Sequence, residues 1–501
     1  MTALVIHGHF YQPTRENPWT GEIEREPSAE PFHDWNERIH SECYRPNAFV
    51  QIKGSGAERI VNNYAKINFN FGPTLLSWLK RQHPDTYTRV VEADRESVRQ
   101  RNGHGNAIAQ AYNHTILPLC NERDRRTQIR WGIADFRHRF AREPEALWLP
   151  ETACNTDVLG LLIDEGLRFV ILAPHQAARI REAGRPDWRE AADYQIDTSV
   201  AYRYSRREGS GGSIAVFFYD GTISRAIAFE GALASATGLV DLFERRARGT
   251  GHLVNVATDG ETYGHHSRFG DIALAYVLEV ESPARGFWIT NYGEYLDHYP
   301  PISEVEISNG PEGEGTSWSC PHGVGRWIRD CGCYTGGEAG WNQAWRGPLR
   351  RALDFLRDEA ARYFEATRGD LFIDPWAARG DYIELIIDRD RSPDLFLNNH
   401  APRSLRPEDK RRALGFLELQ RSAMLMYASC GWFFNDISGI ETLQILKYAR
   451  RAIEWMEQWG LPPVQDHFLE ILAQARSNRA ELGNGADIYR KFVEPLMIKR
   501  E

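Results

Sequence analysis

Short apolar runs alternate with longer amphipathic stretches through the first 300 residues. The apolar runs are rich in β-branched residues and end in glycine, proline or polar residues, which is typical of strands buried on both faces. The stretches between them have the spacing of amphipathic helices. This alternation predicts a mainly parallel sheet of about seven core strands, close to a (β/α) barrel. The clearest strand candidates are residues 3–8, 66–71, 146–149, 168–173, 252–259 and 286–291.

Other segments of this part carry weaker patterns. Residues 14–58 are long and polar, and we expect an insertion of loop and short helix there. Residues 81–113 have a polar helical pattern, and residues 271–280 an apolar one. Residues 213–229 are expected to form a pair of strands, because apolar and β-branched residues recur on both sides of an Asp-Gly turn.

The chain changes character after residue 300. Residues 301–347 are rich in glycine, tryptophan and cysteine, so we expect a loop over the mouth of the barrel. We therefore expect three units: a barrel over 1–300, this loop, and an α-helical domain over 348–501. The apolar stripe of its first helix is Leu349, Leu353, Leu356, Ala360 and Phe364, and further helices are expected over 409–430, 439–459, 464–482 and 486–498.

Composition limits the classes of function. The formal net charge is -9 with acids and bases intermixed, so no nucleic-acid partner is expected. No segment approaches the roughly 20 apolar residues of a membrane helix, and the first residues lack the basic region of a signal peptide. Seven scattered cysteines indicate a reducing compartment, and we expect a cytoplasmic protein. The 15 tryptophans fit a carbohydrate-facing protein, and the oligomeric state does not follow from the sequence.

Two strand candidates end in a carboxylate. Glu151 follows the run ALWLP, in which Trp148 offers a flat surface of the kind on which sugar rings stack. Asp259 ends the run VNVATD and is followed by Gly-Glu. Hydrolysis of a glycosidic bond needs two carboxyl groups, one that stays ionised and one that keeps its proton. The alternative is that both acids cap their strands or bind arginines.

Histidines also stand near strand ends. His7 and His9 are two residues apart in the first strand, so their side chains point to the same side and both could face a site. The alternative is that they cap the core. His114, in AYNHTILPL, is on its pattern alone more typical of packing than of chemistry.

These motifs resemble those of glycoside hydrolase family 57, the amylase and glucanotransferase family. The stretch HGHFYQP (7–13) resembles its N-terminal His-x-His-Gln-Pro motif, with Phe10 and Tyr11 as an extension. INFNFGPTLLSWL resembles the segment after its second strand, and His114 the histidine of its second motif. LWLPE and ATDGETYGHH match the motifs of the nucleophilic Glu and the acid/base Asp. The resemblance covers residues 1–300, whereas the later part is similar to an uncharacterised subgroup.

The resemblance implies an α/β fold, namely an incomplete (β/α)7 barrel followed by a C-terminal α-helical domain. It implies a retaining hydrolase or transglycosylase acting on α-linked glucan or oligosaccharide. Glu151 would be the nucleophile and Asp259 the general acid/base, with carboxyl groups about 5 to 6 Å apart. Neither a cofactor nor a catalytic metal is implied. The candidate substrate-binding residues are His7, His9, Gln12, His114, Trp148, Glu261, His265, Trp318 and His322.

The loop also carries the pattern C-x-H-x8-C-x-C at Cys320, His322, Cys331 and Cys333. These residue types suit zinc, but the spacing differs from that of a standard zinc finger. The alternatives are a loop packed by buried thiols and a substrate-wall role for His322.

Two other classes of function stay open. A metal-dependent glycan deacetylase or mannosidase-like hydrolase also gathers histidine and aspartate at strand ends. A non-catalytic glycan-binding protein would be indicated by loss of one acid, and both Glu151 and Asp259 are present.

Overall fold

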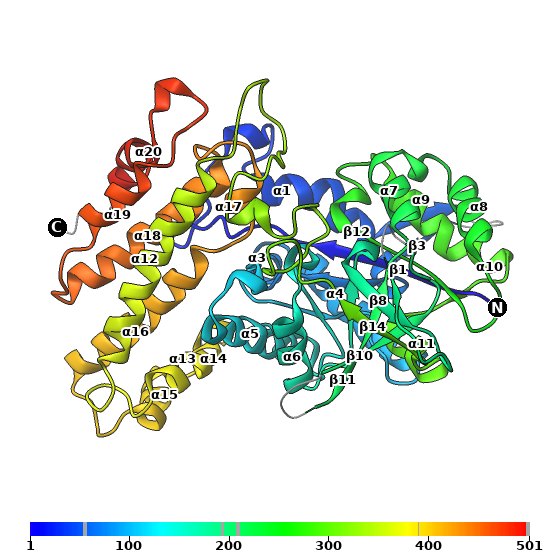
Figure 1. Ribbon diagram of the computed structural model, residues 1–501, viewed down its shortest axis with the longest axis horizontal. Coiled ribbons are helices and arrows are strands. Elements are labelled where there is room, and N and C mark those ends of the chain that lie inside the picture. Colours follow the sequence, from blue (N-terminus) through cyan, green and yellow to red (C-terminus); the bar gives the residue numbers. More distant parts are fainter. Residues whose placement is uncertain (54–57, 192–194, 207–210, 389, 497–501) are drawn as a thin grey trace.

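An α/β part and a helical part make up the chain (Figure 1). The computed structural model describes residues 1–53, 58–191, 195–206, 211–388 and 390–496. The expected α/β class with a helical C-terminal region is confirmed. Within these ranges, no helix combines the length and the apolar character needed to cross a bilayer. The expectations for residues 54–57 and 497–498 lie outside the described residues.

Parallel strands form the centre of the first 300 residues. Their order is β12 (Leu253–Asp259), β1 (Ala3–Phe10), β4 (Asn68–Phe71), β5 (Ala109–Gln110), β6 (Leu147–Trp148), β7 (Phe169–Leu172) and β11 (Ser213–Phe218). Ladders or single parallel bridges join these neighbours. The two end strands also meet, because the backbone N–H of Asp220, just after β11, donates to the Asn255 carbonyl of β12 at 2.8 Å. The sheet is therefore strongly curled. Strand β1 is buried along all eight residues.

Helices follow most of these strands and cover the outside of the sheet (Figure 1). A short strand, β13 (Trp288–Ile289), pairs with the start of β1. The insertion before β4 holds α1 (Trp35–Ile39), α2 (Arg45–Ala48) and the hairpin of β2 (Val50–Lys53) and β3 (Glu58–Val61). The covering helices are α3 (Pro73–Gln82), α4 (Pro84–Gln100), α5 (Glu122–Phe140), α6 (Thr156–Asp164), α7 (Gly221–Phe229), α8 (Ala236–Arg246), α9 (Gly270–Tyr276), α10 (Ser282–Ala284) and α11 (Tyr292–His298).

Several local expectations were wrong, among them the helix expected over 464–482, which is an α-helix only over Gln465–Leu472. Residues 221–229 form helix α7 instead of the second strand of a pair, because the Asp220 side chain caps the helix by accepting from the Ile223 N–H at 2.9 Å. The helical pattern of 81–113 ends at Gln100, and the same stretch contains β5. The stretch 301–347 contains a strand, β14 (Ser303–Ile307), which pairs with β10 (Ala201–Ser205) and β8 (Ala177–Arg181) beside a short β9 (Arg189–Glu190).

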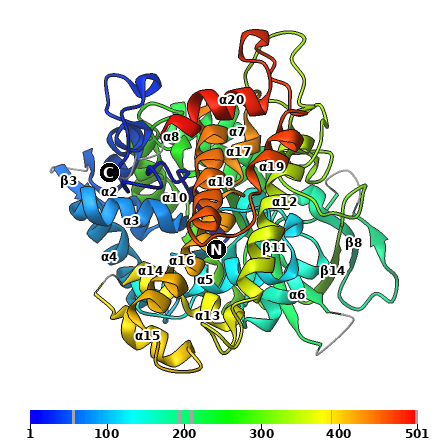
Figure 2. The same cartoon turned by 90° about the vertical axis from the view of Figure 1, so that its left-hand side faces the viewer.

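The helical part is built on α12 (Arg346–Glu365), α16 (Pro407–Leu425) and α18 (Ile440–Gln458), which pack side by side (Figure 2). The predicted stripe of α12 is confirmed, because each of its five residues is fully buried. The indole rings of Trp327, Trp345 and Trp432 belong to this core and are fully buried as well. The shorter helices are α13 (Pro375–Asp381), α14 (Ile383–Ile387), α15 (Pro393–His400), α17 (Cys430–Phe433), α19 (Gln465–Leu472) and α20 (Gly485–Phe492).

Candidate active site

A pocket of about 850 Å³ opens at the carboxyl ends of the parallel strands. Its lining includes Glu151 after β6, His175 after β7, Tyr219 after β11 and Asp259 at the end of β12. Trp318 closes one side of it. A volume of this order holds a ligand of several sugar rings. The two predicted carboxylates therefore share one pocket.

Glu151 lies on a strained turn. Its φ of 59° is left-handed, and the next residue, β-branched Thr152, has a φ of 49°. Such angles are costly for these residue types and persist where the surroundings enforce them. Gln176 provides that enforcement, because its amide nitrogen donates to the Thr152 carbonyl at 2.8 Å while its amide oxygen accepts from the Thr152 hydroxyl at 2.9 Å. The turn aims the Glu151 side chain into the pocket.

Two donors hold one oxygen of the Glu151 carboxylate. The Trp318 indole N–H donates to Oε2 at 3.0 Å, and the Ser319 hydroxyl donates to the same oxygen at 2.7 Å. Burial raises the pKa of Glu151, but these hydrogen bonds and the nearby Arg326 charge act in the opposite direction. The two donors and Arg326 therefore limit the rise in the pKa of Glu151 without reversing it.

Asp259 has different surroundings. Asp259 lines the pocket and is an exposed residue, so solvent in the pocket reaches it. Partial dehydration by the surrounding protein, followed by the negative charges of Glu261 and Glu151, holds the pKa of Asp259 well above its usual range. Among the described residues, no hydrogen-bond donor or cation contacts its carboxyl. Asp259 therefore favours the protonated form.

Glu261 follows Asp259 by two residues and is buried. Its Oε1 accepts from the Tyr44 hydroxyl at 2.6 Å and from the Tyr11 backbone N–H at 3.1 Å. Burial raises the pKa of Glu261 to about 7, although the two hydrogen bonds oppose this shift. Glu261 is thus placed to act on the charge of Asp259 rather than to line the pocket.

A buried layer of aromatic and imidazole rings lies beneath the pocket. Trp148 is 1% exposed and stacks on His7 and His9, with ring centroids 4.6 and 5.0 Å apart. The sequence suggested Trp148 as a sugar platform, but the buried ring has no free face for a sugar. It instead packs edge-on against Trp318, at 5.2 Å between centroids.

Hydrogen bonds order this layer. His9 Nδ1 lies 2.9 Å from the Asn70 amide nitrogen and 3.3 Å from the Asn70 amide oxygen, and His9 Nε2 is the ring nitrogen on the far side. That Nε2 lies 3.1 Å from His114 Nε2, and His114 Nδ1 lies 2.7 Å from the Ser429 hydroxyl. Burial lowers the pKa of His114 to about 3 and that of His7 to about 4, so both rings are neutral at pH 7. This chain of contacts links β1 to the helical part.

The helical part reaches the pocket through residues 429–433. The Ser429 backbone N–H donates to the His114 carbonyl at 2.9 Å, and Phe433 lines the pocket. The half-buried Cys430 lies next to Tyr11. Residues more than 270 positions after Glu151 therefore complete its surroundings.

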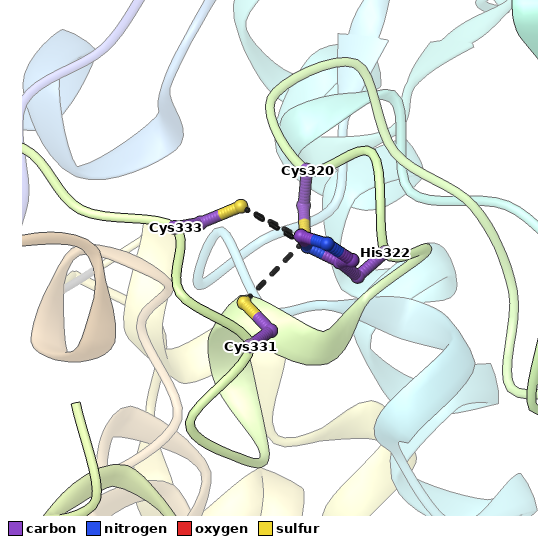
Figure 3. Close-up of side chains that lie close together, drawn as sticks. All are labelled: Cys320, His322, Cys331 and Cys333. Atoms are coloured by element: carbon purple, nitrogen blue, oxygen red, sulfur yellow. Dashed lines mark hydrogen bonds between the residues drawn. The ribbon is translucent and has the colours of Figure 1, made fainter. Parts of the chain in front are cut away.

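The remaining candidates lie away from the pocket lining. Gln12 accepts from the Arg15 guanidinium at 3.2 Å, and His265 pairs with Glu42. His322 belongs to the cysteine cluster of the loop (Figure 3). Substrate contact by these three residues stays a prediction, as does the separation of the two carboxyl groups.

Sequence reasoning missed several residues of the pocket. Ser319, Phe229 and Phe433 line it, and His175 lines it while its Nε2 lies 2.9 Å from the Ser317 carbonyl. Ser319 directly follows Trp318, which the sequence had placed at the substrate, so its position next to Trp318 could have indicated that it lines the pocket. Phe229 is 84% exposed at the end of helix α7, in a stretch where the sequence predicted a strand, so no sequence signal placed it at the pocket. Nothing in the sequence connects Phe433 to residue 151.

Comparison with known families gives two matches. The model described as Glycosyl hydrolase family 57 matches residues 3–307, and a model described as a domain of unknown function, DUF3536, matches residues 341–501. Alpha-amylase 1 of Dictyoglomus thermophilum is 22% identical over 106 residues. That stretch is 21% of this chain and 15% of the curated relative, so the chain spans only a small part of that protein.

Solved structures resemble the chain over nearly its whole length. An exo-type maltose-forming amylase from Pyrococcus sp. ST04 has a TM-score of 0.69 at 16% identity, covering 99% of this chain and 93% of that one. A branching enzyme from Thermococcus kodakaraensis has a TM-score of 0.54 at 16% identity, covering 99% and 96%. The 4-alpha-glucanotransferase from Thermococcus litoralis has a TM-score of 0.54 at 14% identity, covering 91% and 60%. At these identities the likeness concerns the fold.

Proposed function

We propose that this chain, which belongs to glycosyl hydrolase family 57, cleaves α-linked glucan or oligosaccharide with retention of configuration, as a hydrolase or a transglycosylase. One observation carries the proposal. Glu151 and Asp259 line the same pocket in different surroundings, since two donors hold the first carboxylate, whereas among the described residues no donor contacts the second, whose pKa the nearby acids raise. That asymmetry is what separates a nucleophile from a general acid.

The reaction follows from these surroundings. Hydrogen bonds occupy Oε2 of Glu151, and within the described ranges Oε1 accepts none, so Oε1 attacks the anomeric carbon. Asp259 gives its proton to the departing glycosidic oxygen as the bond to carbon breaks. The resulting glycosyl ester of Glu151 is then attacked by water or by a sugar hydroxyl. Asp259, now ionised, takes the proton of that attacking group.

The substrate class rests on the pocket and on the relatives. The solved relatives are an amylase, a branching enzyme and a glucanotransferase by name. The rings of Phe229, Trp318 and Phe433 stand around the pocket and can stack on sugar faces. Water and a sugar hydroxyl compete for the same intermediate, so the product mixture decides between hydrolysis and transfer.

The test is a screen of the purified full chain on α-glucans and maltooligosaccharides, with product analysis by chromatography. Proton NMR of the first products reads the anomeric configuration before mutarotation. We expect the α-anomer from wild type. Glu151→Gln should lower kcat at least about a thousandfold, equivalent to ~4 kcal/mol of barrier. First products with the β-configuration would overturn the retaining assignment.

A metal-dependent deacetylase or mannosidase-like hydrolase is the second candidate. It needs three or more ligand side chains converging at the pocket. Among the described residues, the groups that converge in this way are the loop cluster and Glu37, His40 and His83, and neither includes Glu151 or Asp259. Release of acetate from an acetylated glycan, without new reducing ends, would favour this candidate. Binding without any product would favour a glycan-binding protein.

We also propose a division of the chain into a catalytic unit over 1–300, a loop over 301–347 and a helical unit over 348–501. The two family matches, which end at 307 and begin at 341, support this division. A cytoplasmic location is proposed because all seven cysteines are free in the structure. Limited proteolysis would test the boundaries, since cleavage should concentrate between the units.

A further inference from the structure

Four ligand-type side chains converge beside the segment that holds Glu151 (Figure 3). They are Cys320, His322, Cys331 and Cys333, and their ligand atoms all lie within 4.8 Å of one another. Cys320 is buried, Cys331 and Cys333 are half-buried, and His322 is exposed. Residues 320–322 and 331–333 come from opposite sides of one turn of the loop, so the cluster closes that turn.

The distances fit a single tetrahedral ion. The Cys320 sulfur lies 3.8 Å from that of Cys331 and 3.7 Å from that of Cys333, and the Cys333 sulfur lies 3.5 Å from His322 Nδ1. With Zn–S bonds of about 2.3 Å and Zn–N bonds of about 2.05 Å, tetrahedral geometry separates two sulfurs by about 3.8 Å and a sulfur from a nitrogen by about 3.5 Å. The three contacts match the edges of such a tetrahedron.

Charge complements the geometry. The buried guanidinium of Arg346 donates to the Cys333 carbonyl at 2.8 Å, and the buried guanidinium of Arg326 donates to the Ser319 carbonyl at 3.1 Å. In the parts of the chain that the structure describes, neither guanidinium is in ion-pair contact with a carboxylate. Two buried cations without carboxylate partners favour anions nearby. Three thiolates and a divalent ion carry a net charge of −1, which is attracted to these two positive charges.

We propose that Cys320, His322, Cys331 and Cys333 bind one structural Zn²⁺. Each thiol loses its proton on binding, and the imidazole binds in its neutral form. All four positions of the tetrahedron are then protein ligands, which is the arrangement of a structural site rather than a catalytic one.

The ion would fix the segment that positions Glu151. Trp318 and Ser319 directly precede Cys320, and both donate to the Glu151 carboxylate. The Ser317 hydroxyl donates to the Gly323 carbonyl at 2.7 Å, so the turn around the cluster is already tied to this segment. Without the ion, the donors would sit on a long glycine-rich loop. The metal site itself stands on side-chain geometry, whereas its effect on Glu151 rests on the proposed function.

The test begins with the wild-type full chain, expressed with zinc in the medium and purified without chelator. Elemental analysis should give about one zinc per chain. Cys331→Ser and Cys333→Ser should each reduce the zinc to below about 0.1 per chain, while Cys120→Ser, which removes a thiol outside the cluster, should leave it unchanged. Replacement by Co²⁺ should give the strong d–d absorption of tetrahedral thiolate coordination.

Several results would overturn the zinc site. Wild-type protein without zinc, in which all the cluster thiols react at once with a thiol reagent, would show ordinary free thiols without a bound metal. Iron in place of zinc, or a disulfide between two of these cysteines in freshly purified protein, would also refute it. These readouts do not depend on turnover, so an inactive protein with one zinc per chain would count against the proposed function and not against the site.

Discussion

Trp318 holds Glu151 at two points. Its backbone N–H donates to the Glu151 carbonyl at 3.0 Å, and its indole N–H donates to the Glu151 carboxylate at the same distance. Two backbone hydrogen bonds of 2.9 Å between Cys154 and Thr316 align the two segments alongside each other. The loop is therefore part of the proposed catalytic centre, because it sets both the turn and the charge of the nucleophile.

Removal of a donor should move the acid limb of the activity profile. In Trp318→Phe and Ser319→Ala, one hydrogen bond that lowers the pKa of Glu151 is lost, so that pKa rises and the acid limb of kcat/KM moves to higher pH. A hydrogen bond to a charged group is worth about 1.5–3 kcal/mol, so kcat/KM should fall roughly 10- to 100-fold. A pH–rate profile checks both effects. The melting temperature should change little, and a collapse of stability with an unchanged profile would show that the loop is only structural.

Neutralising Glu261 should move the alkaline limb of the pH–rate profile. Its charge contributes to the raised pKa of Asp259, so Glu261→Gln lowers that pKa. The general acid then loses its proton at lower pH, and the alkaline limb of kcat/KM moves to lower pH. The matched control is Glu165→Gln, because this carboxylate pairs with Arg130 away from the pocket. Identical alkaline limbs in wild type and Glu261→Gln would refute the electrostatic role.

Phe229 offers a test of sugar stacking. Its ring is 84% exposed and lines the pocket. Phe229→Ala should weaken glucan binding by roughly 1–2 kcal/mol, or 5- to 30-fold in Kd, with little change in melting temperature. Phe269→Ala is the control, since this ring is 61% exposed but outside the pocket lining. Calorimetric titration with a maltooligosaccharide measures the difference. Equal loss in both variants would contradict a specific platform.

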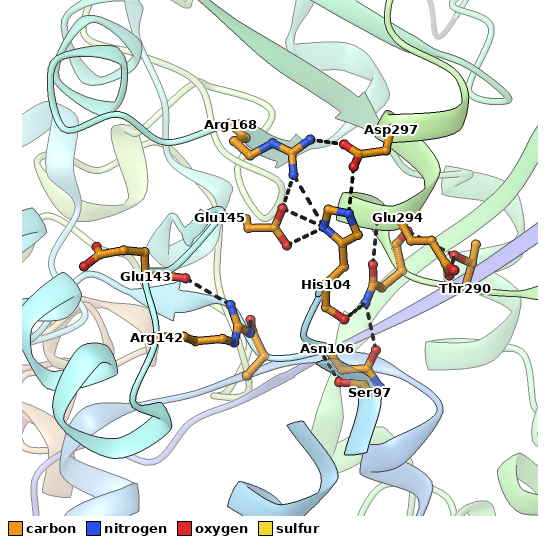
Figure 4. Close-up of polar contacts among 12 residues, drawn as sticks. Ser97, His104, Asn106, Arg142, Glu143, Glu145, Arg168, Thr290, Glu294 and Asp297 are labelled. Carbon is orange, nitrogen blue, oxygen red and sulfur yellow. Dashed lines mark hydrogen bonds and ion pairs between the residues drawn. The ribbon is translucent and has the colours of Figure 1, made fainter. Parts of the chain in front are cut away.

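An ion-pair network around the buried His104, with the partly exposed partners Arg168 and Asp297, lies at the opposite end of the strands and should affect stability alone (Figure 4). His104 contacts Glu145 at 3.0 Å and Asp297 at 2.9 Å, and Arg168 pairs with both carboxylates. His104→Ala leaves these partners incompletely paired, so the free energy of unfolding should fall by about 1–3 kcal/mol.

Chemical denaturation measures that loss, and kcat should stay at the wild-type value. The control is His467→Ala, which removes an exposed pair with Glu470. A His104→Ala enzyme with normal stability and low kcat would contradict this assignment.

Much of the fold could be predicted from local pattern. The apolar runs at 3–8, 168–173 and 252–259 became β1, β7 and β12, and the stripe of α12 is buried as expected. Patterns succeed there because burial on a sheet or along a helix face repeats within a few residues. They failed at 213–229, where the Asp220 cap outweighed β-branched composition. They also failed for β5, whose two residues are too few to show a period.

The sequence by itself determined the strand-end positions of Glu151 and Asp259, the histidines of the first strand and the ligand types of the loop, because each is a property of neighbours along the chain. Tertiary structure decided which of these groups meet. It buried Trp148 between histidines, buried Glu261 close to Asp259, and brought Ser319 and Phe433 to the pocket. Apart from the sequence neighbours Asp259 and Glu261, these contacts join residues more than 100 positions apart, and the pKa effects depend on distance and dehydration in space. No local period encodes either quantity.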